Sequence, residues 1–596
     1  MKLSHCLPAI GLPAFALPAF AVATACLMTG IGKSQEAMPA RPGLASQVQG
    51  KAADTIYTGG DIITINDKQP SAEALAVKGG KIVAVGPRAD VEKAYKGVTT
   101  KVVDLGGKAL LPGFLDAHSH YISALSVAHQ VNLYAPPAGP GKDPASIVAE
   151  IVKFRDTNKI AKGEVIQAYG YDDNAMPNGR RLNRDDLDKA FPDNPVLVGH
   201  VSMHGAVLNS AALKKWGISA KTKTPPGGII VRKPGTQEPY GLIMETAYLP
   251  IFATLPQPTK AQELAWSKAG QLIYAQHGIT TAHEGATHLA DLELMKRAAT
   301  ASTPLIDVVA YPFITDLEAI LQRYPKETWG KYDNRIKIGG VKITIDGSPQ
   351  GKTAYFTTPY LTGGPGGETA WLGELSFPED VITKAVKRVY AMGVPLNLHA
   401  NGDAAIDTFL RAHEQAAAGD LGKERHVTMI HSQFVRKDQL DKYVLYKIRP
   451  SFYTLHTYYF ADAHIANRGH AQTMNISPMR DAIDKGLVPT NHTDFIVAPL
   501  DQMFMMGSAV NRLSRSGEVI GADQRVTPME ALKAMTINVA QQYDEQASKG
   551  SLEVGKLADL VVLDRNPLKV DPMQIKTIKV METIKEGQSI YKRMEP

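Results

Sequence analysis

The residues best suited to chemistry in this chain are Asp116, His118 and His120, which stand two positions apart directly after an apolar run over residues 109–115. Side chains alternate along an extended strand, so these three are predicted to point to one face of a strand. Neutral imidazole is a good ligand for zinc and related divalent ions, and a neighbouring carboxylate suits a hydrolytic metal site. The spacing therefore predicts two imidazoles that converge on one metal ion.

Further candidate ligands follow other apolar runs. In an eight-stranded parallel barrel, catalytic side chains lie at the carboxyl ends of the strands, so ligand-type residues at the ends of strand-like runs are informative. The positions that meet this test would all face the same mouth of such a barrel. They are Lys342 within the run 336–345, His399 after 395–398, His431 after 427–430 and Asp494 after 487–489.

Short apolar runs at both ends of the chain and a long mixed middle define the expected architecture. β-branched runs separated by glycine pairs fill residues 54–110 and return within residues 511–596 after a helix predicted over 531–540, so we expect the two ends to form one β-sandwich. Residues 111–510 alternate strand-like runs with amphipathic helices, which predicts an α/β fold with a (β/α)8 TIM-like barrel. The middle exceeds the roughly 250 residues of a plain barrel, and the Pro- and Gly-rich stretch 121–260 is the expected insertion.

Residues 1–28 have the layout of a secretory signal peptide, with Lys2, then an apolar stretch, then small residues. A membrane-spanning anchor is the alternative, but three prolines weaken the stretch as a helix. Ala25-Cys26 also resembles a loose lipoprotein cleavage box, so a lipid anchor at Cys26 is the one membrane attachment that we consider. The protein is thus predicted to be exported, to a bacterial periplasm, with residues 29–53 as a linker.

Composition narrows the classes of function. The chain has 596 residues, 44% hydrophobic and 21% charged, with a formal net charge of +6, as is typical of a globular protein with more than one structural unit. The sequence has no long basic run interleaved with aromatics, so nucleic acid is not an expected partner. Its two cysteines, Cys6 and Cys26, both lie in the predicted signal peptide. Any metal in the mature body must rest on nitrogen and oxygen ligands, and the expected partners are a small molecule and, in a homo-oligomer, further copies of the chain.

As a set, these motifs resemble the amidohydrolase superfamily, and within it the amidohydrolase-3 (YtcJ-like) family. The match runs in the family's order from about residue 54 to the C-terminus. The set is highly specific, although each motif alone is weak. The motifs are Pro112 to His120, Val341-Lys342 to Asp346-Gly347, His399 to Asp403, His431-Ser432-Gln433, His492-Thr493-Asp494 and Gly555 to Leu560.

The resemblance implies a set of metal ligands for one or two divalent ions, of which zinc is the expected one. The ligands are His118, His120 and Asp494 for the first ion, and His399 and His431 for the second, with Lys342 between the two. Lys342 would bridge as a carbamate made from its amine and carbon dioxide. A free ammonium repels a cation, so Lys342 ligates only when it is neutral or carboxylated. A buried, paired lysine is the alternative, which leaves the number of ions open.

Other polar residues are predicted to have supporting roles. The resemblance places His204 near the substrate, and His456 follows another strand-like run. For both, substrate contact and structural packing are equally good interpretations. Asp116 and His492 are expected to lie next to the metal ligands and to hold them in orientation. For His283, a hydrogen-bonded core position is favoured over a position in the pocket.

The metal defines the expected chemistry. Coordination lowers the pKa of water to about 7 and so supplies hydroxide at neutral pH, while Asp494 would accept a proton and return it to the leaving nitrogen. We therefore expect an enzyme, a metal-dependent amidohydrolase that cleaves non-peptide carbon–nitrogen bonds in an amide, N-acyl amine or N-formyl amine. An ester, lactone or carbamate hydrolase is the alternative among enzymes. A non-catalytic metal-binding sensor and a solute-binding protein are the alternatives outside them.

Overall fold

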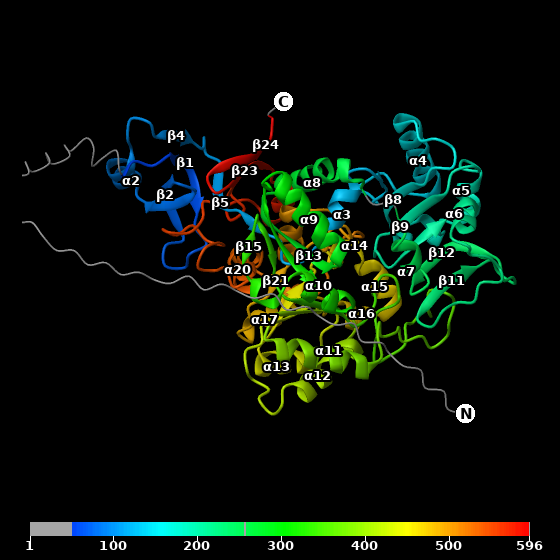
Figure 1. Cartoon of the computed structure of the whole chain (residues 1–596). Coiled ribbons are helices and arrows are strands. Elements are labelled where there is room, and N and C mark those ends of the chain that lie inside the picture. Colours follow the sequence, from blue (N-terminus) through cyan, green and yellow to red (C-terminus); the bar gives the residue numbers. More distant parts are fainter. Residues whose placement is uncertain (1–50, 256–257, 595–596) are drawn as a thin grey trace, which may run out of the picture. The chain divides into compact units, whose positions relative to one another are not determined.

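The computed structural model describes residues 51–255 and 258–594 (Figure 1). The predicted signal peptide over residues 1–28, with Cys26, lies outside the described residues, and so does most of the predicted linker. None of the helices in the described ranges is long and apolar enough to cross a membrane.

Strands from both ends of the chain pair in one sheet (Figure 1). In sheet order they are β24 (Gln588–Lys592), β23 (Val580–Lys585), β22 (Leu560–Leu563), β5 (Ala109–Pro112), β1 (Thr55–Ile63), β2 (Ser71–Lys78) and β3 (Lys81–Gly86), with β4 (Lys101–Asp104) beside β1. β5 is the junction, because it runs parallel to β1 and antiparallel to β22, with Leu110 opposite Val562. The two ends therefore do pair. Within the described residues the strands belong to one hydrogen-bonded sheet that branches at β1, and a two-layer sandwich stays a prediction.

Alternating side chains bury both faces of this end sheet. In β2, Leu75 and Val77 join one apolar cluster, whereas Ala74 and Ala76 join another. This is the period of two that a strand imposes on its side chains. The alternation explains why the glycine-separated runs at the two ends form strands that share a core.

Two further sheets carry the candidate ligands. In the described part of the chain, one contains β6 (Phe114–Leu115), β13 (Ile279–Thr287), β14 (Asp307–Pro312) and β16 (Ile336–Ile338) in parallel, with β15 (Tyr332–Asp333) antiparallel at its edge. The other contains β17 (Val341–Thr344), β18 (Leu396–Ala400), β19 (Val427–His431), β20 (Ile448–Phe452) and β21 (Thr490–Asn491), all parallel. Helices between these strands include α8 (Lys260–Ala275), α9 (Leu289–Ala301), α10 (Leu317–Arg323), α11 (Glu379–Met392), α12 (Asp403–Ala416), α13 (Lys437–Tyr446) and α17 (Met479–Asp484). Parallel strands that alternate with helices are the α/β pattern that the sequence predicted.

Two glycines separate β16 from β17, which are consecutive in the chain but belong to different sheets. A Cβ atom at Gly339 would lie 2.7 Å from Val309 Cγ1, and one at Gly340 would lie 2.3 Å from the carbonyl oxygen of Pro395. Only glycine leaves room where the backbone passes this close to both neighbouring strands. The two sheets therefore meet at this point.

The sheets are also joined where their first and last parallel strands end. The backbone N–H of His120 donates to Phe495 O at 2.8 Å, and that of Asp494 donates to His118 O at 3.2 Å. Since these segments follow β6 and β21, the hydrogen bonds bring candidate ligands from opposite ends of the sequence together.

A third sheet lies within residues 121–260, the stretch that the sequence assigns to an insertion. Its strands, in sheet order, are β11 (Gly228–Arg232), β12 (Pro239–Glu245), β10 (Gly205–Leu208), β9 (Val196–His200), β8 (Ile166–Tyr171) and β7 (Val131–Asn132). It has apolar clusters of its own, one of which contains Ile166 and Val198. The turn between β9 and β10 carries His204, and β12 ends at Glu245, so this unit supplies polar side chains to the site described below.

The helix predicted over residues 531–540 is two short helices, α19 (Pro528–Lys533) and α20 (Ile537–Gln542). A capping box starts α19, because Thr527 Oγ1 accepts a hydrogen bond from Glu530 N at 3.3 Å and Thr527 N donates to Glu530 Oε2 at 2.8 Å. The prediction of one continuous helix is nevertheless wrong. Thr536 has φ −133° and ψ −97°, outside the helical region, so the chain changes direction there.

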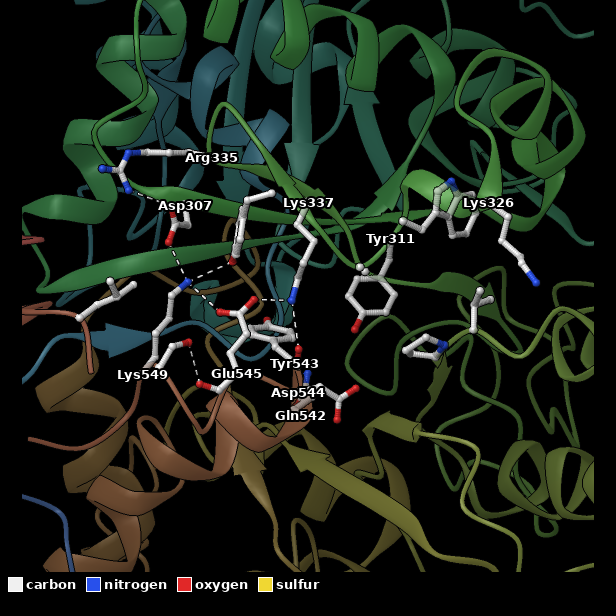
Figure 2. A pocket seen from close by; sticks show the side chains of 18 of the residues that line it. Asp307, Tyr311, Lys326, Arg335, Lys337, Gln542, Tyr543, Asp544, Glu545 and Lys549 are labelled. Atoms are coloured by element: carbon white, nitrogen blue, oxygen red, sulfur yellow. Dashed lines mark hydrogen bonds and ion pairs between the residues drawn. The ribbon is translucent and has the colours of Figure 1, made fainter. Parts of the chain in front are cut away.

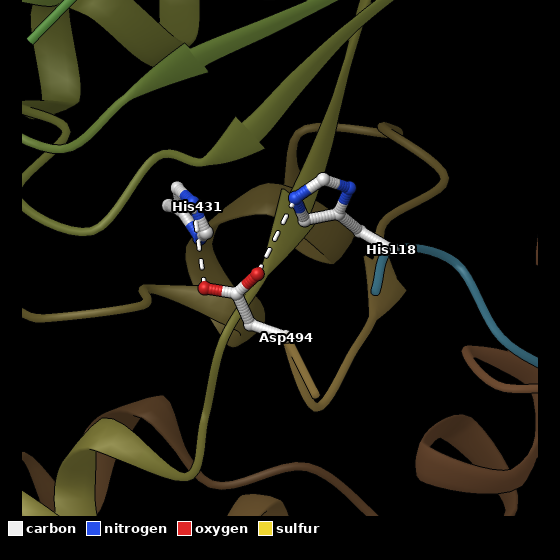
Figure 3. Close-up of side chains that lie close together, drawn as sticks. All are labelled: His118, His431 and Asp494. Carbon is white, nitrogen blue, oxygen red and sulfur yellow. Dashed lines mark ion pairs between the residues drawn. The ribbon is translucent and has the colours of Figure 1, made fainter. Parts of the chain in front are cut away.

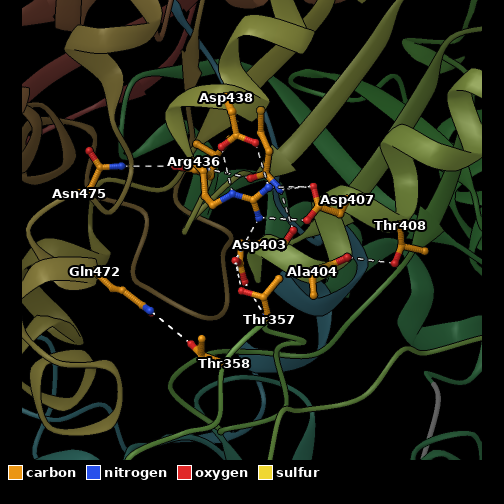
Figure 4. Close-up of polar contacts among 12 residues, drawn as sticks. Thr357, Thr358, Asp403, Ala404, Asp407, Thr408, Arg436, Asp438, Gln472 and Asn475 are labelled. Atoms are coloured by element: carbon orange, nitrogen blue, oxygen red, sulfur yellow. Dashed lines mark hydrogen bonds and ion pairs between the residues drawn. The ribbon is translucent and has the colours of Figure 1, made fainter.

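Arg436 ties together the segments that leave β18 and β19 (Figure 4). Its guanidinium group donates to Asp403 at 3.1 Å, to Asp407 at 3.0 Å and to Asp438 at 3.0 Å. Asp403 and Asp407 lie in α12, and Asp438 lies in α13. The network therefore links the segments that follow the two strands carrying His399 and His431.

Candidate metal centre

Candidate ligands from different strands meet in a buried cluster (Figure 3). One side-chain nitrogen of His118, one of His431 and one carboxylate oxygen of Asp494 lie within 4.8 Å of one another. Asp494 Oδ1 is 3.4 Å from Nε2 of His118 and 3.4 Å from Nε2 of His120, and Oδ2 is 3.9 Å from Nε2 of His431. The side chain of His120 is 22% exposed, so solvent reaches the cluster from its side.

The distances between the imidazole nitrogens and the carboxylate oxygens, and the types of these donor atoms, fit a divalent metal ion. Zinc binds imidazole nitrogen at about 2.0–2.1 Å, so two ligands of a tetrahedral ion lie roughly 3.3–3.4 Å apart. The contacts of Asp494 with His118 and His120 both measure 3.4 Å. Asp494 Oδ1 is buried, and no hydrogen-bond donor from the described residues reaches it. A buried carboxylate oxygen without a donor is costly unless a cation neutralises it.

Burial keeps the histidines in the neutral form that binds metal. Desolvation is the largest of the effects that lower the pKa of His118, His399 and His431 well below 6.5. Burial alone would raise the pKa of Asp494, but the side chain of His120, with smaller effects from His492 and Lys342, outweighs burial and holds that pKa below 3.8. Neutral imidazoles beside an ionised carboxylate are the protonation states that a divalent ion requires.

Two of the candidate ligands have unusual backbone conformations. His431 has φ +73° and Asp494 has φ +53°. Non-glycine residues in the left-handed region are uncommon, and they concentrate at functional sites where surrounding structure holds them in place. His431 is the last residue of β19, and Asp494 lies three residues after the end of β21; both side chains reach the cluster.

The extended strand that the sequence predicts through His118 and His120 is wrong. β6 ends at Leu115, and residues 117–118 form a bend. Both imidazoles still reach Asp494 Oδ1. Their convergence is produced by a bend in the backbone and not by the alternation of side chains along a strand.

Residues far away in the sequence hold this bend. Side chains of Gln542 and Tyr543, at the end of α20, donate hydrogen bonds to the carbonyl oxygens of residues 116–117. A Cβ atom at Gly285 would lie 2.2 Å from His118 Cε1 and 2.7 Å from its Nδ1, so the imidazole occupies space that only glycine leaves free. No local pattern marks these three residues, because their role depends on contacts with a distant segment.

Lys342 lies beside the cluster in β17. Its Nζ is 3.4 Å from Nε2 of His118, and the residue is 2% exposed. Burial lowers the pKa of its ammonium group to about 7, against the opposing effects of Asp494 and Glu284. Burial thus favours the neutral amine, which is the form that reacts with carbon dioxide.

His399 and His431 lie next to each other, with ring centroids 4.6 Å apart. Nδ1 of His431 is 3.0 Å from Nε2 of His492, whose Nδ1 is 2.9 Å from Ser451 Oγ. For Nε2 of His431 to bind metal, Nδ1 must carry the ring proton and donate a hydrogen bond to Nε2 of His492. The three-residue cluster consists of His118, His431 and Asp494, and His399 lies beside it. Nε2 of His399 is 3.0 Å from Asn401 Nδ2.

The two predicted substrate contacts lie in different surroundings. Nδ1 of His204 is 3.1 Å from Glu245 Oε2, and its ring centroid is 5.9 Å from that of His399. With 21% of its side chain exposed, His204 stands at the opening of the site. His456 is buried, and its Nδ1 is 2.9 Å from Nε2 of His464.

Asp116 and His283 are both buried next to the cluster. Neither carboxylate oxygen of Asp116 has a hydrogen-bond partner among the described residues, and burial raises its pKa to about 7. Its side chain thus makes no hydrogen bond to the histidines that it was expected to support. His283 bonds to Ser119 O at 3.3 Å through Nδ1 and to Asn397 Nδ2 at 3.1 Å through Nε2.

A cavity of about 800 Å³ lies elsewhere, at the amino-terminal ends of the parallel strands (Figure 2). Asp307 and Lys337 line it from β14 and β16, and Glu545 and Lys549 line it from the segment after α20. Lys549 Nζ is 2.7 Å from carboxylate oxygens of both Asp307 and Glu545. Since each of these buried charges has an oppositely charged partner, we assign them to stability.

Replacing Lys549 by methionine is expected to lower the free energy of unfolding by about 1.5–3 kcal/mol, because it removes charged contacts with two buried carboxylates. Asp307 keeps Lys585 as a partner and Glu545 keeps Lys337, so neither charge is left uncompensated. Urea denaturation followed by circular dichroism measures the change. The matched control is Lys384→Met, which removes an exposed pair with Asp380 and is expected to cost at most about 1 kcal/mol. Equal costs for the two variants would show that the buried network does not contribute as assigned.

The similarity to known proteins extends over most of the chain. The model of the amidohydrolase family matches residues 101–591. The chain belongs to the amidohydrolase family. Over 559 residues this amidohydrolase is 25% identical to YtcJ of Bacillus subtilis, which covers 90% of this chain and 99% of that protein. The YtcJ-like resemblance found in the sequence motifs is thereby confirmed.

This amidohydrolase has other full-length relatives. It is 25% identical over 561 residues to the N-substituted formamide deformylase of Arthrobacter pascens, covering 91% of this chain and 98% of that one. The structure of an uncharacterized metal-dependent hydrolase from Pyrococcus horikoshii matches with a TM-score of 0.67 at 22% identity, over 87% of this chain and 99% of that one. A second such hydrolase, from Pyrococcus furiosus, matches with a TM-score of 0.64 at 24% identity, over 86% of this chain and 100% of that one. At these identities the likeness shows a shared fold.

Proposed function

We propose that this amidohydrolase is a metal-dependent hydrolase that cleaves a non-peptide carbon–nitrogen bond, with an N-formyl or other N-acyl amine as its substrate. The observation that carries the proposal is the buried cluster of His118, His431 and Asp494. In it, Asp494 Oδ1 faces two imidazoles and accepts no hydrogen bond from the described residues. Similarity to the N-substituted formamide deformylase of Arthrobacter pascens favours this class of bond.

We further infer that the two ligand-bearing sheets close into one eight-stranded barrel, with β16 and β17 together as its fourth strand. Hydrogen bonds between the segments after β6 and β21 support closure on one side. A parallel bridge between Phe313 and Lys342 supports it on the other. Closure would place all the candidate ligands at one end of the barrel, as the proposed chemistry requires.

The proposed ion is zinc, because the body of the chain has no cysteine and the cluster offers imidazole and carboxylate donors. The ligands would be His118, His120 and Asp494 for one ion, with His399, His431 and a carboxylated Lys342 for a second. The short contact between Lys342 Nζ and His118 Nε2 supports a bridging position for this lysine.

The side chains around the ion have separable roles. A bound divalent ion supplies an activated water at neutral pH and polarises a substrate carbonyl. Asp494 is placed to take the proton that the water loses and to pass it to the leaving nitrogen, which needs it because an amine anion leaves poorly. His431 is held in orientation by His492, and His204 stands at the opening with Glu245 behind it, where the remainder of a substrate would lie.

Metal analysis of the purified full-length protein, combined with a panel of formamides, longer N-acyl amines, esters, lactones and carbamates, tests the proposal. We expect at least one equivalent of metal and the highest kcat/KM with a formamide or another amide. A higher kcat/KM with an ester, lactone or carbamate would favour that alternative on the same site. Tight binding of panel compounds without turnover would instead indicate a sensor or a solute-binding protein.

Removal of the metal by a chelator is expected to abolish turnover and to lower the melting temperature, and added zinc should restore both. A ligand present at one hundred times its Kd stabilises a folded protein by about 2.7 kcal/mol. Differential scanning calorimetry and activity assays on the same samples measure the two effects. Full turnover by protein that retains less than a tenth of an equivalent of metal would rule out the proposed mechanism.

A further inference from the structure

Tyr453 has a hydroxyl group that the fold leaves without a partner. The residue directly follows β20, at the same strand ends as His431, and it is 1% exposed. Its hydroxyl oxygen is buried, and within residues 51–255 and 258–594 no group bonds to it. Buried polar atoms are nearly always hydrogen-bonded, so an exception beside a candidate active site calls for a missing partner.

The surroundings of Tyr453 place it against the metal cluster. Its ring centroid is 5.3 Å from that of His492 and 6.1 Å from that of His431. Burial is the main reason that the pKa of its phenol lies well above 10, and Asp494 is the first charged group that adds to this effect. The ring therefore lies against imidazoles of the candidate site, and the phenol keeps its proton at neutral pH.

Neighbouring tyrosines show that unpaired hydroxyls are not a general property of this region. The hydroxyl of Tyr134 donates to Ile496 O at 2.6 Å, and that of Tyr274 is 2.7 Å from Ser119 Oγ. Both bonds join segments of the fold. Tyr453 has no such structural bond in the described chain, although it is as deeply buried.

We propose that Tyr453 is a catalytic residue whose hydroxyl donates a hydrogen bond to the carbonyl oxygen of the bound amide. The inference rests on the proposed function and identifies a residue that stabilises its transition state. Hydrogen-bond donors placed where negative charge develops are among the largest contributors to enzymatic acyl transfer.

The step balances without a further reactant. Water forms a bond to the carbonyl carbon, the π electrons of the carbonyl move to its oxygen, and Asp494 takes one proton from the water. The hydrogen bond from Tyr453 strengthens as that oxygen becomes negative. When the carbonyl re-forms, the carbon–nitrogen bond breaks and the amine leaves with the proton from Asp494, so Tyr453 ends the cycle with its own proton.

The test compares the metal-loaded, full-length Tyr453→Phe variant with the wild type on the best amide substrate of the panel. We expect kcat to fall by about 10²–10³-fold, with KM, metal content and melting temperature nearly unchanged. The matched control is Tyr446→Phe in α13, which removes a hydroxyl that donates to Glu414 Oε1 of α12 at 2.8 Å. This control is expected to keep the wild-type kcat.

An inhibitor distinguishes this role from a structural one. A phosphinate analogue of the substrate carries a negative oxygen where the attacked carbonyl oxygen would lie. Its Ki should rise in Tyr453→Phe by the same factor by which kcat/KM falls, while the Ki of the uncleavable ketone analogue of the substrate changes little.

Each other outcome overturns the inference. A kcat within threefold of the wild type shows that Tyr453 is not required, while the proposed function stands. A fall in metal content or melting temperature that accounts for the loss shows a structural role, and an unchanged phosphinate Ki shows that the hydroxyl acts elsewhere. If the wild type hydrolyses none of the panel, the proposed function fails and this inference fails with it.

Discussion

Replacing Asp494 by asparagine is expected to lower kcat by at least roughly 10³-fold while the chain still folds. Asparagine keeps the size of the side chain but cannot accept the proton of the attacking water. It also removes the negative charge that faces Nε2 of His118 and of His120 at 3.4 Å, so metal affinity is expected to fall. Steady-state kinetics on metal-loaded protein and elemental analysis measure the two effects separately.

The stability of this variant is a further check. Asp494 Oδ1 is buried and receives no hydrogen bond from the described residues, so the metal-free variant should be at least as stable as the metal-free wild type. The matched control is Asp484→Asn at an exposed pair with Arg480, for which activity should not change. Wild-type kcat in Asp494→Asn would contradict the assigned proton transfer, whereas lost kcat at full metal content would isolate it.

Gly285→Ala is expected to lower kcat/KM by at least about 10²-fold, although residue 285 is not a predicted ligand. The added methyl group would lie 2.2 Å from His118 Cε1, and the imidazole is buried, so the ring must shift from its position. Overpacking of this kind costs about 1–3 kcal/mol, and displacement of a reacting group by about 1 Å can cost 10²-fold in rate. Metal content at saturating zinc is expected to fall below half of the wild-type value.

A glycine with open space around it provides the control for this variant. At Gly86, at the end of β3, a Cβ atom would meet nothing within 4 Å, so Gly86→Ala should leave metal content and activity unchanged. Kinetics, elemental analysis and melting temperature of both variants complete the comparison. Wild-type metal content and activity in Gly285→Ala would show that His118 adjusts its position without loss, and the close fit would then have no functional importance.

Local sequence patterns predicted the strand ends better than the segments between them. His399 and His431 lie at the ends of β18 and β19, as the apolar runs before them indicated, because buried parallel strands need continuous apolar sequence. The same reasoning failed at His118, where β6 stops at Leu115 and a bend follows. Hydrogen bonds from Gln542 and Tyr543, at the end of α20, hold that bend, and contacts across such a distance in the sequence leave no periodic signal.

The sequence by itself determined the donor types of the candidate site, their order along the chain, the exclusion of thiolate ligands and the alternating α/β plan. Only the tertiary structure decided that His431, and not His399, joins His118 and Asp494 in the closest cluster. It also decided that Gly285 makes room for His118 and that the hydroxyl of Tyr453 stays unpaired in the described chain. The physical reason is that periodicity encodes which residues are buried, whereas distances between buried residues far apart in sequence are set by how the strands and loops pack.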